Sequence, residues 1–264
     1  MCIEGGYTPF GLAISLLVYG NDISKTEFEE VIKFFKKNGF DMNAKVPSTK
    51  GGTHLHSAVG NLSSINDSSK IETVIELLVN NGCDINAQND DGNTPIMSNI
   101  KFINLATINQ LIKSGIDLNK RNKEGNTAVD ILANEPCCSS VNGIENESLI
   151  AILPKTDLTQ KHPKKGLLPF LVAVREKKNT DGMSKIIEET CRQLKSKGLS
   201  KNDALDILFE EYKKTSSTAV ADYMLGTATK GDKENIIGSV ITVSGSCFNS
   251  VRDAMFKTIE DLWP

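Results

Sequence analysis

A turn sequence recurs along the first half of this 264-residue chain and limits the folds that are open to it. The pattern Gly-x-Asp-x-Asn begins at Gly39, Gly82 and Gly115, each time after a run of apolar residues with helical spacing. Gly82 and Gly115 are 33 residues apart, and every copy is followed by a Gly-x-Thr sequence. A period of this size is typical of helical repeats, which stack because one unit cannot bury its own apolar face.

Each residue type in the repeat has a structural reason. A glycine after a helix can adopt the left-handed conformation that ends the helix. The following Asp is expected to bond to the backbone two residues on and so to form a turn. The Thr is expected to accept amide hydrogen bonds at the start of the next helix, where Pro is favoured next, as in Thr8-Pro9 and Thr94-Pro95. The pattern therefore predicts paired antiparallel helices joined by tight turns.

The spacing is larger in the first repeats. Gly39 and Gly82 are 43 residues apart, and Thr8 and Thr53 are 45 apart. The stretches 20–26 and 63–69, between the two helices of each repeat, are rich in Asn, Asp and Ser. Such composition predicts inserted surface loops there.

The repeat resembles that of the ankyrin family, in which G-x-T-P-L-H-x-A is followed later by L-L-x-x-G-A-D-x-N-A. The resemblance is carried by residues 6–13, 51–58, 77–87 and 92–96, with His54 in the proline position of the second segment. It covers residues 5–135 with four repeats and implies an all-α solenoid with short hairpin loops.

Residues 166–174 mimic residues 6–14, which implies a degenerate fifth repeat at 148–198 and a solenoid domain of residues 1–198. Residues 199–264 are then expected to form a helical cap or appendage. Ser200, with Asp203 three residues on, predicts a helix start. Further helices are expected at 218–229 and 246–262, and the segment 234–243 could be helix or strand.

Patterns for metal binding and catalysis are sparse. His54 and His56 occupy structural positions of the repeat, and the six cysteines include no C-x-x-C spacing, so no metal, cofactor or disulfide framework is expected. Residues 244–248 faintly resemble the C-G-S-C-W segment of papain-like proteases. Cys247 could then be a nucleophile, with His162 as the base available outside the repeats. A cysteine-dependent hydrolase in residues 199–264 is therefore the alternative to a non-enzymatic protein.

The main expectation is a scaffold that binds another protein. In the ankyrin family, the hairpin tips and first helices form a concave binding face. Carried over by position, the expected partner-binding residues are Lys45, Val46, Lys50, Gln88, Asn89, Asp90, Arg121, Asn122, Lys123, Tyr19, Asn61 and Asn99. The tips run basic, acidic and then mixed, which favours a protein surface with both signs of charge over nucleic acid.

Net charge and composition limit the kinds of partner and the cellular location that are expected. A net charge of −3 provides no general attraction to nucleic acid, and no apolar run reaches the roughly 18 residues that span a bilayer, so no membrane insertion is expected. The chain is rich in Lys, Asn and Ile, as proteins from AT-rich genomes are. Together with the repeats, this suggests an effector of an intracellular bacterium that engages a host protein. The expected location is the cytoplasm, or a host cell after secretion.

Overall fold

The computed structural model describes residues 8–20, 24–46, 49–133, 144–166, 168–169, 180–204, 206–208 and 257–263. The regular secondary structure of these residues is helical, and one isolated antiparallel bridge joins Val46 to Gly52. The expected all-α class is therefore confirmed for the described part of the chain. The helix expected at 218–229 and the segment 234–243 lie outside it, whereas residues 257–262, at the end of the last expected helix, are helical.

The chain divides into two compact units. The first comprises Met1–Leu132 with Asn142–Ile152, and the second comprises Ala133–Val141 with Leu153–Pro264. The named helices of the first unit are α1 (Pro9–Tyr19), α2 (Lys25–Lys37), α3 (His54–Leu62), α4 (Ser68–Asn80), α5 (Pro95–Asn99), α6 (Leu105–Lys113), α7 (Ala128–Ala133) and α8 (Ile144–Ile152). The degenerate repeat expected at 148–198 is thus split between the units, and both that repeat and a domain boundary at 198 stay predictions.

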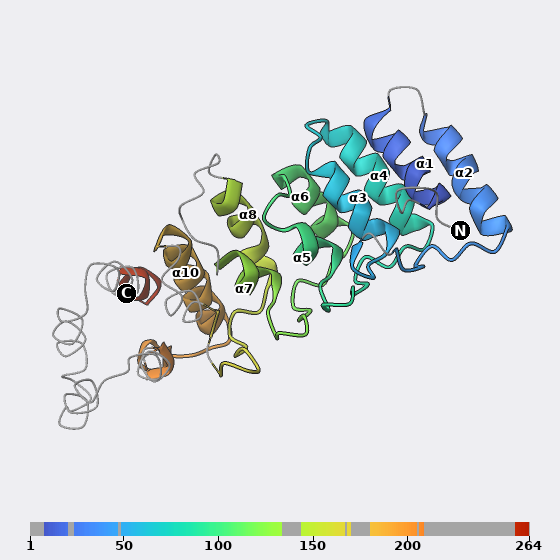
Figure 1. The fold of residues 1–264 in the computed structure, drawn as a ribbon. Helices are drawn as coiled ribbons and strands as arrows, with labels where there is room; N and C mark the ends of the chain where they lie inside the picture. The colour runs from blue at the N-terminus through green and yellow to red at the C-terminus, as the bar shows by residue number, and fades with distance from the viewer. Residues whose placement is uncertain are drawn as a thin grey trace. The chain divides into compact units, whose positions relative to one another are not determined.

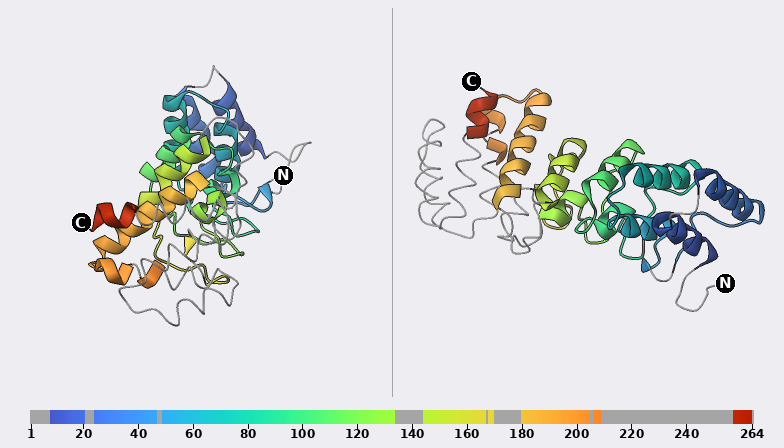
Figure 2. Two further views of the ribbon diagram at one scale, coloured as in Figure 1. Left: turned by 90° about the vertical axis from the view of Figure 1, so that its left-hand side faces the viewer. Right: turned by 90° about the horizontal axis from the view of Figure 1, so that it is seen from above.

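Two layers of helices build the first unit. In one layer, α3 packs between α1 and α5, and in the other, α6 packs between α4 and α8. Contacts of α1 and α3 with α4 join the two layers, and α1 also packs against α2. Figures 1 and 2 show successive helices of each layer side by side, with the two helices of a pair running in opposite directions. We call the layer of α1, α3 and α5 the inner layer, and the layer of α4, α6 and α8 the outer layer.

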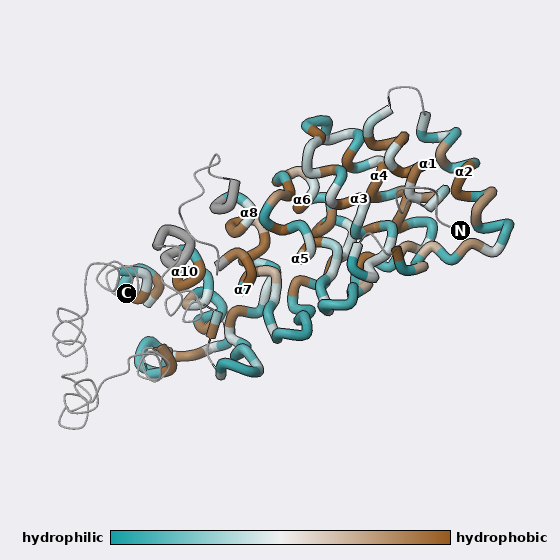
Figure 3. The backbone as a smooth tube through the Cα atoms, in the orientation of Figure 1, coloured by the Kyte–Doolittle hydropathy of each residue, from teal (hydrophilic) through white to brown (hydrophobic). Residues whose placement is uncertain are grey.

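Apolar side chains at helical spacing hold the layers together. Buried core positions recur through α1 to α6 and include Phe10, Phe28, Leu55, Ile75, Leu78, Ile96 and Leu111. Figure 3 shows this as hydrophobic positions that recur along the helices, while the connecting loops are largely hydrophilic. Each layer therefore buries its apolar face against the other, which no single helix pair could do alone.

The extra residues of the longer repeat lie in its helices. α3 and α4 span nine and thirteen residues, whereas α5 and α6 span five and nine. The joining loops, residues 63–67 and 100–104, are both five residues long. Each helix of the longer repeat is therefore four residues longer, about one helical turn, which keeps the same faces aligned. The prediction of an inserted surface loop at 63–69 is therefore wrong, and the one at 20–26 falls partly outside the described residues and stays a prediction.

The polar residues that suggested insertions are helix caps. Ser24 accepts the Glu27 amide proton at the start of α2. Asp67 accepts the amide protons of Ser69 and Lys70 at the start of α4. Ser, Asp and Asn are favoured both in loops and at N-caps, so their abundance alone did not separate the two.

The predicted corners of the repeat are present. Gly39, Gly82 and Gly115 have φ angles of 74°, 100° and 87°, in the left-handed region that favours glycine. In each copy, the Asp side chain accepts the amide proton two residues on, at 2.8–2.9 Å. Thr8 and Thr127 accept the amide protons of the residues three positions on, as expected of N-caps, but the Thr94 hydroxyl makes no such bond.

The second unit is described chiefly around α10 (Thr180–Ser196) and the 3-10 helix η2 (Leu153–Lys155). The Gln193 amide group clamps the loop after η2, since it accepts from Leu158 N–H and donates to the Thr156 carbonyl, both at 2.9 Å. Near the C-terminus, Trp263 Nε1 donates to the Leu199 carbonyl at 3.2 Å. These contacts tie the loop at 156–158 and residue 263 to the C-terminal part of α10 and the residues after it. Among the described residues, every helix is too short or too polar to cross a bilayer.

Candidate functional site

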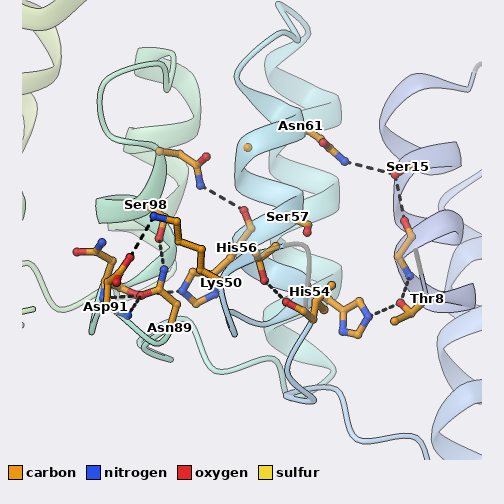
Figure 4. Close-up of a pocket in the computed structure, with 16 residues that line it drawn as sticks. Thr8, Ser15, Lys50, His54, His56, Ser57, Asn61, Asn89, Asp91 and Ser98 are labelled. Carbon is orange, nitrogen blue, oxygen red and sulfur yellow. Dashed lines mark hydrogen bonds and ion pairs between the residues drawn. The ribbon is translucent and has the colours of Figure 1, made fainter. Parts of the chain in front are cut away.

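A pocket of about 500 Å³ opens on the inner layer of the first unit. Its sixteen lining residues come from α1, α3, α5 and the segments beside them: Thr8, Gly11, Ser15, Val46, Thr49, Lys50, His54, His56, Ser57, Gly60, Asn61, Asn89, Asp91, Asn93, Ser98 and Asn99. None of these residues belongs to α2, α4 or α6. Figure 4 shows side chains from three successive repeats around this pocket.

Small residues and oriented amides form the helical wall of the pocket. A Cβ on Gly60 would lie 3.0 Å from Asn99 Oδ1, so glycine leaves room for that amide. Asn99 Nδ2 donates to the carbonyls of His56 and Pro95, both at 3.2 Å. Asn61 Nδ2 donates to Ser15 Oγ at 3.4 Å. Both side-chain amides are therefore held by their nitrogen ends.

His56 joins α3 to the next hairpin. The Thr53 amide donates to His56 Nδ1 at 3.0 Å, and His56 Nε2 lies 3.0 Å from the Asn93 carbonyl oxygen. Because Nδ1 accepts a proton, Nε2 carries the ring proton and donates to that carbonyl. Burial lowers the pKa of His56, although the bond to Asn93 acts in the opposite direction. The ring is therefore neutral and fixed in one tautomer.

His54 lies in an aromatic cluster at the edge of the pocket. Its ring makes an edge-to-face contact with Phe10 at 5.1 Å and a tilted contact with Phe40 at 5.4 Å, measured between ring centroids. His54 Nε2 lies 2.6 Å from Thr8 Oγ1, which links α3 to the start of α1. Burial lowers the pKa of His54 to about 4, with a smaller opposing effect of Asp41. Neither histidine of the pocket thus carries charge at neutral pH.

Two asparagines of the hairpin tips organise the backbone around them. Asn89 Oδ1 accepts the amide protons of Asp91 and Asn93, at 3.0 and 2.9 Å. Asn122 Oδ1 accepts those of Glu124 and Asn126, at 3.0 and 2.9 Å, and Asn122 Nδ2 donates to Asn93 Oδ1. Because these side chains complete the turns, their expected role in partner contact stays a prediction.

Other predicted contact residues also bond within the protein. Gln88 Nε2 donates to the carbonyls of Gly92 and Arg121, the latter at 2.9 Å. The Arg121 guanidinium donates to the Gly125 carbonyl and lies 3.6 Å from the buried Asp130 carboxylate. The Lys123 amide donates to the Asp91 carbonyl at 3.0 Å. The Gln88 side chain and the Lys123 backbone thus attach the third hairpin to the second, whereas the Arg121 side chain bonds within its own repeat.

Two ion pairs connect the first hairpin to the second. Lys45 Nζ lies 2.6 Å from Asp90 Oδ1, and Lys50 Nζ lies 3.6 Å from Asp91 Oδ2. The first pair lies outside the pocket, whereas both members of the second line it. Lys50 also has a φ angle of 50°, a left-handed conformation that is uncommon for a residue with a side chain. Its backbone carbonyl accepts the Asp90 amide proton at 3.0 Å.

An exposed apolar stripe lies on α1. Leu12, Leu16 and Tyr19 are 45%, 49% and 57% exposed, and their spacing places them on one face of the helix. The Tyr19 hydroxyl donates to the carbonyl of Asn61, a residue that lines the pocket, at 3.4 Å.

Of the predicted residues, Val46, Lys50, Asn61, Asn89 and Asn99 line the pocket, with Val46 itself buried. Leu12 and Leu16 are not among the predicted residues, because an apolar residue in a helix usually belongs to the core.

The candidate catalytic cysteine, Cys247, lies outside the described residues. The described cysteines Cys83 and Cys191 are buried, and burial raises the pKa of each thiol to about 12. His162 is buried as well, and its Nδ1 accepts the amide protons of Lys164 and Lys165, both at 3.2 Å. That nitrogen therefore shapes the loop at 162–165.

Across the described part of the chain, no three His, Cys, Asp or Glu side chains come together as a metal ion would require. His54 and His56 take part in the hydrogen bonds and packing described above. Comparison with protein-family models and with curated proteins finds no match to this chain.

Proposed function

We propose that the first unit is an ankyrin-type repeat scaffold that binds a partner protein on its inner layer. The observation that carries the proposal is the pocket, whose lining comes from three successive inner helices and the hairpins beside them. A partner seated there would contact several repeats at once. Repeat proteins commonly bind through such a surface.

The separation of buried apolar positions from polar positions at the pocket supports this proposal. The core is supplied by apolar positions such as Phe10, Leu55 and Ile75. The pocket side chains Ser57, Asn61 and Ser98 lie outside that core and are half-buried or exposed. Residues that the fold does not need for burial are free to suit a partner.

The chemistry of the surface also suits a protein. Leu12, Leu16 and Tyr19 offer an apolar stripe next to a polar pocket, as in protein interfaces, where an apolar and aromatic centre is combined with polar contacts. The ion pairs of the hairpin tips supply both signs of charge. Duplex nucleic acid would favour a run of basic residues instead.

Site-specific photocrosslinking tests the proposal. A benzoylphenylalanine in place of Leu16 or Ser57 would lie on the inner layer, and one in place of Lys33 or Asn109 would lie at exposed positions on α2 or α6. We expect a discrete crosslinked protein from the first two positions and none from the controls. The experiment is run in lysates of a eukaryotic cell and of a bacterium in parallel, because the composition predicts an effector with a host partner.

Thermal unfolding of each variant serves as the control for folding. A second control adds excess unlabelled protein, which should compete the crosslink away. The proposal fails if the product forms equally well from Lys33 and Asn109, or if the inner positions give no product that the unlabelled protein can compete.

A further inference from the structure

Three of the side chains that line the pocket, Asn61, Asp91 and Asn99, present acceptor oxygens. The carbonyls of His56 and Pro95 take both Nδ2 hydrogens of Asn99, so the acceptor Oδ1 is the polar atom of this side chain that is left for a ligand. Asn61 Nδ2 is directed to Ser15 Oγ, which leaves Asn61 Oδ1 without a hydrogen bond to the described residues. Asp91 adds a carboxylate to the same lining.

The positive charge in the pocket is carried by Lys50. Of the sixteen lining residues, only Lys50, His54 and His56 can be cationic, and burial lowers the pKa of both histidines. The Lys50 side chain extends across the pocket toward Asp91 (Figure 4). Its ammonium group neutralises the one carboxylate of the lining.

The ion pair between Lys50 and Asp91 is weak. The distance from Lys50 Nζ to Asp91 Oδ2 is 3.6 Å, and the two side chains are 80% and 54% exposed. Ion pairs with this exposure contribute little to stability. The ammonium can therefore leave the carboxylate at small cost.

The backbone conformation of Lys50 also supports a functional role for this residue. Lys50 and Gly51 have φ angles of 50° and 69°, and consecutive residues of this kind form a tight turn that favours Asn-Gly. Lysine at such a position is a local departure from the preferred turn chemistry, and such departures concentrate at functional sites.

We infer that the pocket receives a basic side chain of the partner, a guanidinium or an ammonium group, and that Lys50 holds its place until the partner arrives. This rests on the proposed function, which it deepens by naming the chemistry of the partner. The incoming cation forms an ion pair with Asp91 and donates to Asn99 Oδ1. Lys50 moves into solvent, so the net charge of the filled pocket is unchanged.

An anionic group fits the same lining less well. It would meet the Asp91 carboxylate and the Asn99 amide oxygen, which the two bonds of Asn99 Nδ2 hold in place, and both repel negative charge. Its partner would be Lys50, which already balances Asp91. A guanidinium, in contrast, presents five donors to these acceptors.

The test is a titration of the full chain with N-acetyl-arginine amide, followed by NMR through the side-chain amide signals of Asn61 and Asn99. N-acetyl-citrulline amide is the uncharged probe of matched shape, and N-acetyl-glutamate amide is the anionic one. We expect saturable shifts with the arginine probe alone. Asp91→Asn should weaken binding at least about fivefold, and Lys50→Ala should tighten it about threefold.

Asp90→Asn is the matched control, because Asp90 is the next carboxylate on the same hairpin, pairs with Lys45 and does not line the pocket. It should leave binding unchanged. Equal shifts with the citrulline or glutamate probe, or equal losses from Asp90→Asn and Asp91→Asn, would overturn the inference. Unchanged or weaker binding by Lys50→Ala would overturn the role of Lys50.

The comparison of probes needs no variant and so does not depend on how a substitution folds. It also separates this inference from the proposed function. Arginine binding without inner-layer crosslinks would leave the pocket chemistry in place and remove the protein partner. Crosslinks without arginine binding would leave the protein partner in place and overturn the proposed pocket chemistry.

Discussion

The Nε2 atom of His56 lies 3.0 Å from the carbonyl oxygen of Asn93, so the first turn of α3 is bonded to the hairpin of the next repeat. The same ring accepts the Thr53 amide proton through Nδ1. One buried side chain thus caps its own helix and fixes the position of the following repeat. Both bonds require the neutral ring with its proton on Nε2.

The variant His56→Ala should lower the free energy of unfolding by about 2–3 kcal/mol, because it leaves a buried amide and a carbonyl without partners. Urea unfolding at pH 7.5 measures this loss. Ser57→Ala is the control, since Ser57 is the next residue and is only half-buried, and it should change stability by less than about 0.5 kcal/mol. Equal effects of the two variants would show that His56 does not join the repeats.

Acid should destabilise the first unit through its histidines. The pKa of His54 is about 4 in the folded protein and 6.5 in its ordinary state, so above pH 6.5 the ring is neutral in both states. As the pH falls from 6.5 to 4, the unfolded chain takes up a proton and the folded chain does not, so stability is lost. His54 alone accounts for about 3 kcal/mol over this window, and the lowered pKa of His56 acts in the same direction.

Urea unfolding at several pH values between 7.5 and 4.5 tests this. His54→Gln should flatten the dependence of stability on pH, whatever its effect at pH 7.5. A slope equal to that of the unaltered protein would contradict the assignment to His54.

Two glycines with a positive φ should differ in their tolerance of a side chain. Gly82→Ala meets no atom within 4 Å and should cost about 1 kcal/mol from backbone conformation alone. A Cβ on Gly92 would lie 2.7 Å from the backbone nitrogen of Lys123, in the next hairpin, so Gly92→Ala should cost about 2 kcal/mol or more. Thermal or urea unfolding of the pair gives the difference, and losses of equal size would argue against the close stacking of hairpins.

Lys50→Asn should stabilise the first hairpin by about 0.5 kcal/mol, because Asn tolerates the left-handed conformation better than Lys does. Urea unfolding at moderate salt measures the change. Lys45→Asn, on the same hairpin but without the positive φ, is the control and should give no gain. A loss of stability in Lys50→Asn would mean that the backbone of Lys50 is not strained.

Cys83 and Cys191 should resist alkylation in the folded protein. Burial raises the pKa of both thiols to about 12, and the thiolate is the form that reacts. Mass spectrometry after iodoacetamide treatment at pH 8 should find both peptides unmodified without urea and modified with it. Rapid labelling of either cysteine without urea would contradict the buried positions.

Residues close in sequence made much of the fold predictable. The left-handed glycines after α2, α4 and α6 and the Asp turns that follow them depend on atoms within a few residues of one another. The position of the extra residues could not be predicted in the same way. Ser24 and Asp67 cap helices, yet the same residue types also occur in loops, so composition at 63–69 could not show that α3 and α4 were each a turn longer.

The candidate site was predictable only in outline. Position in the repeat identified Lys50, Asn61 and Asn99, which do line the pocket. It could not show that Arg121 and Asn122 are engaged by Asp130 and Asn93, nor that Leu12 and Leu16 are exposed. These facts depend on which neighbour lies against each helix.

The sequence by itself determined the corners of the repeat and the alternation of helices, because hydrogen bonds within a turn join residues two to five positions apart. The tertiary structure decided which polar groups hold repeats together and which line the pocket. His56 and Asn93 are 37 residues apart, and Lys50 and Asp91 are 41 apart, so these pairs exist only once neighbouring repeats have stacked.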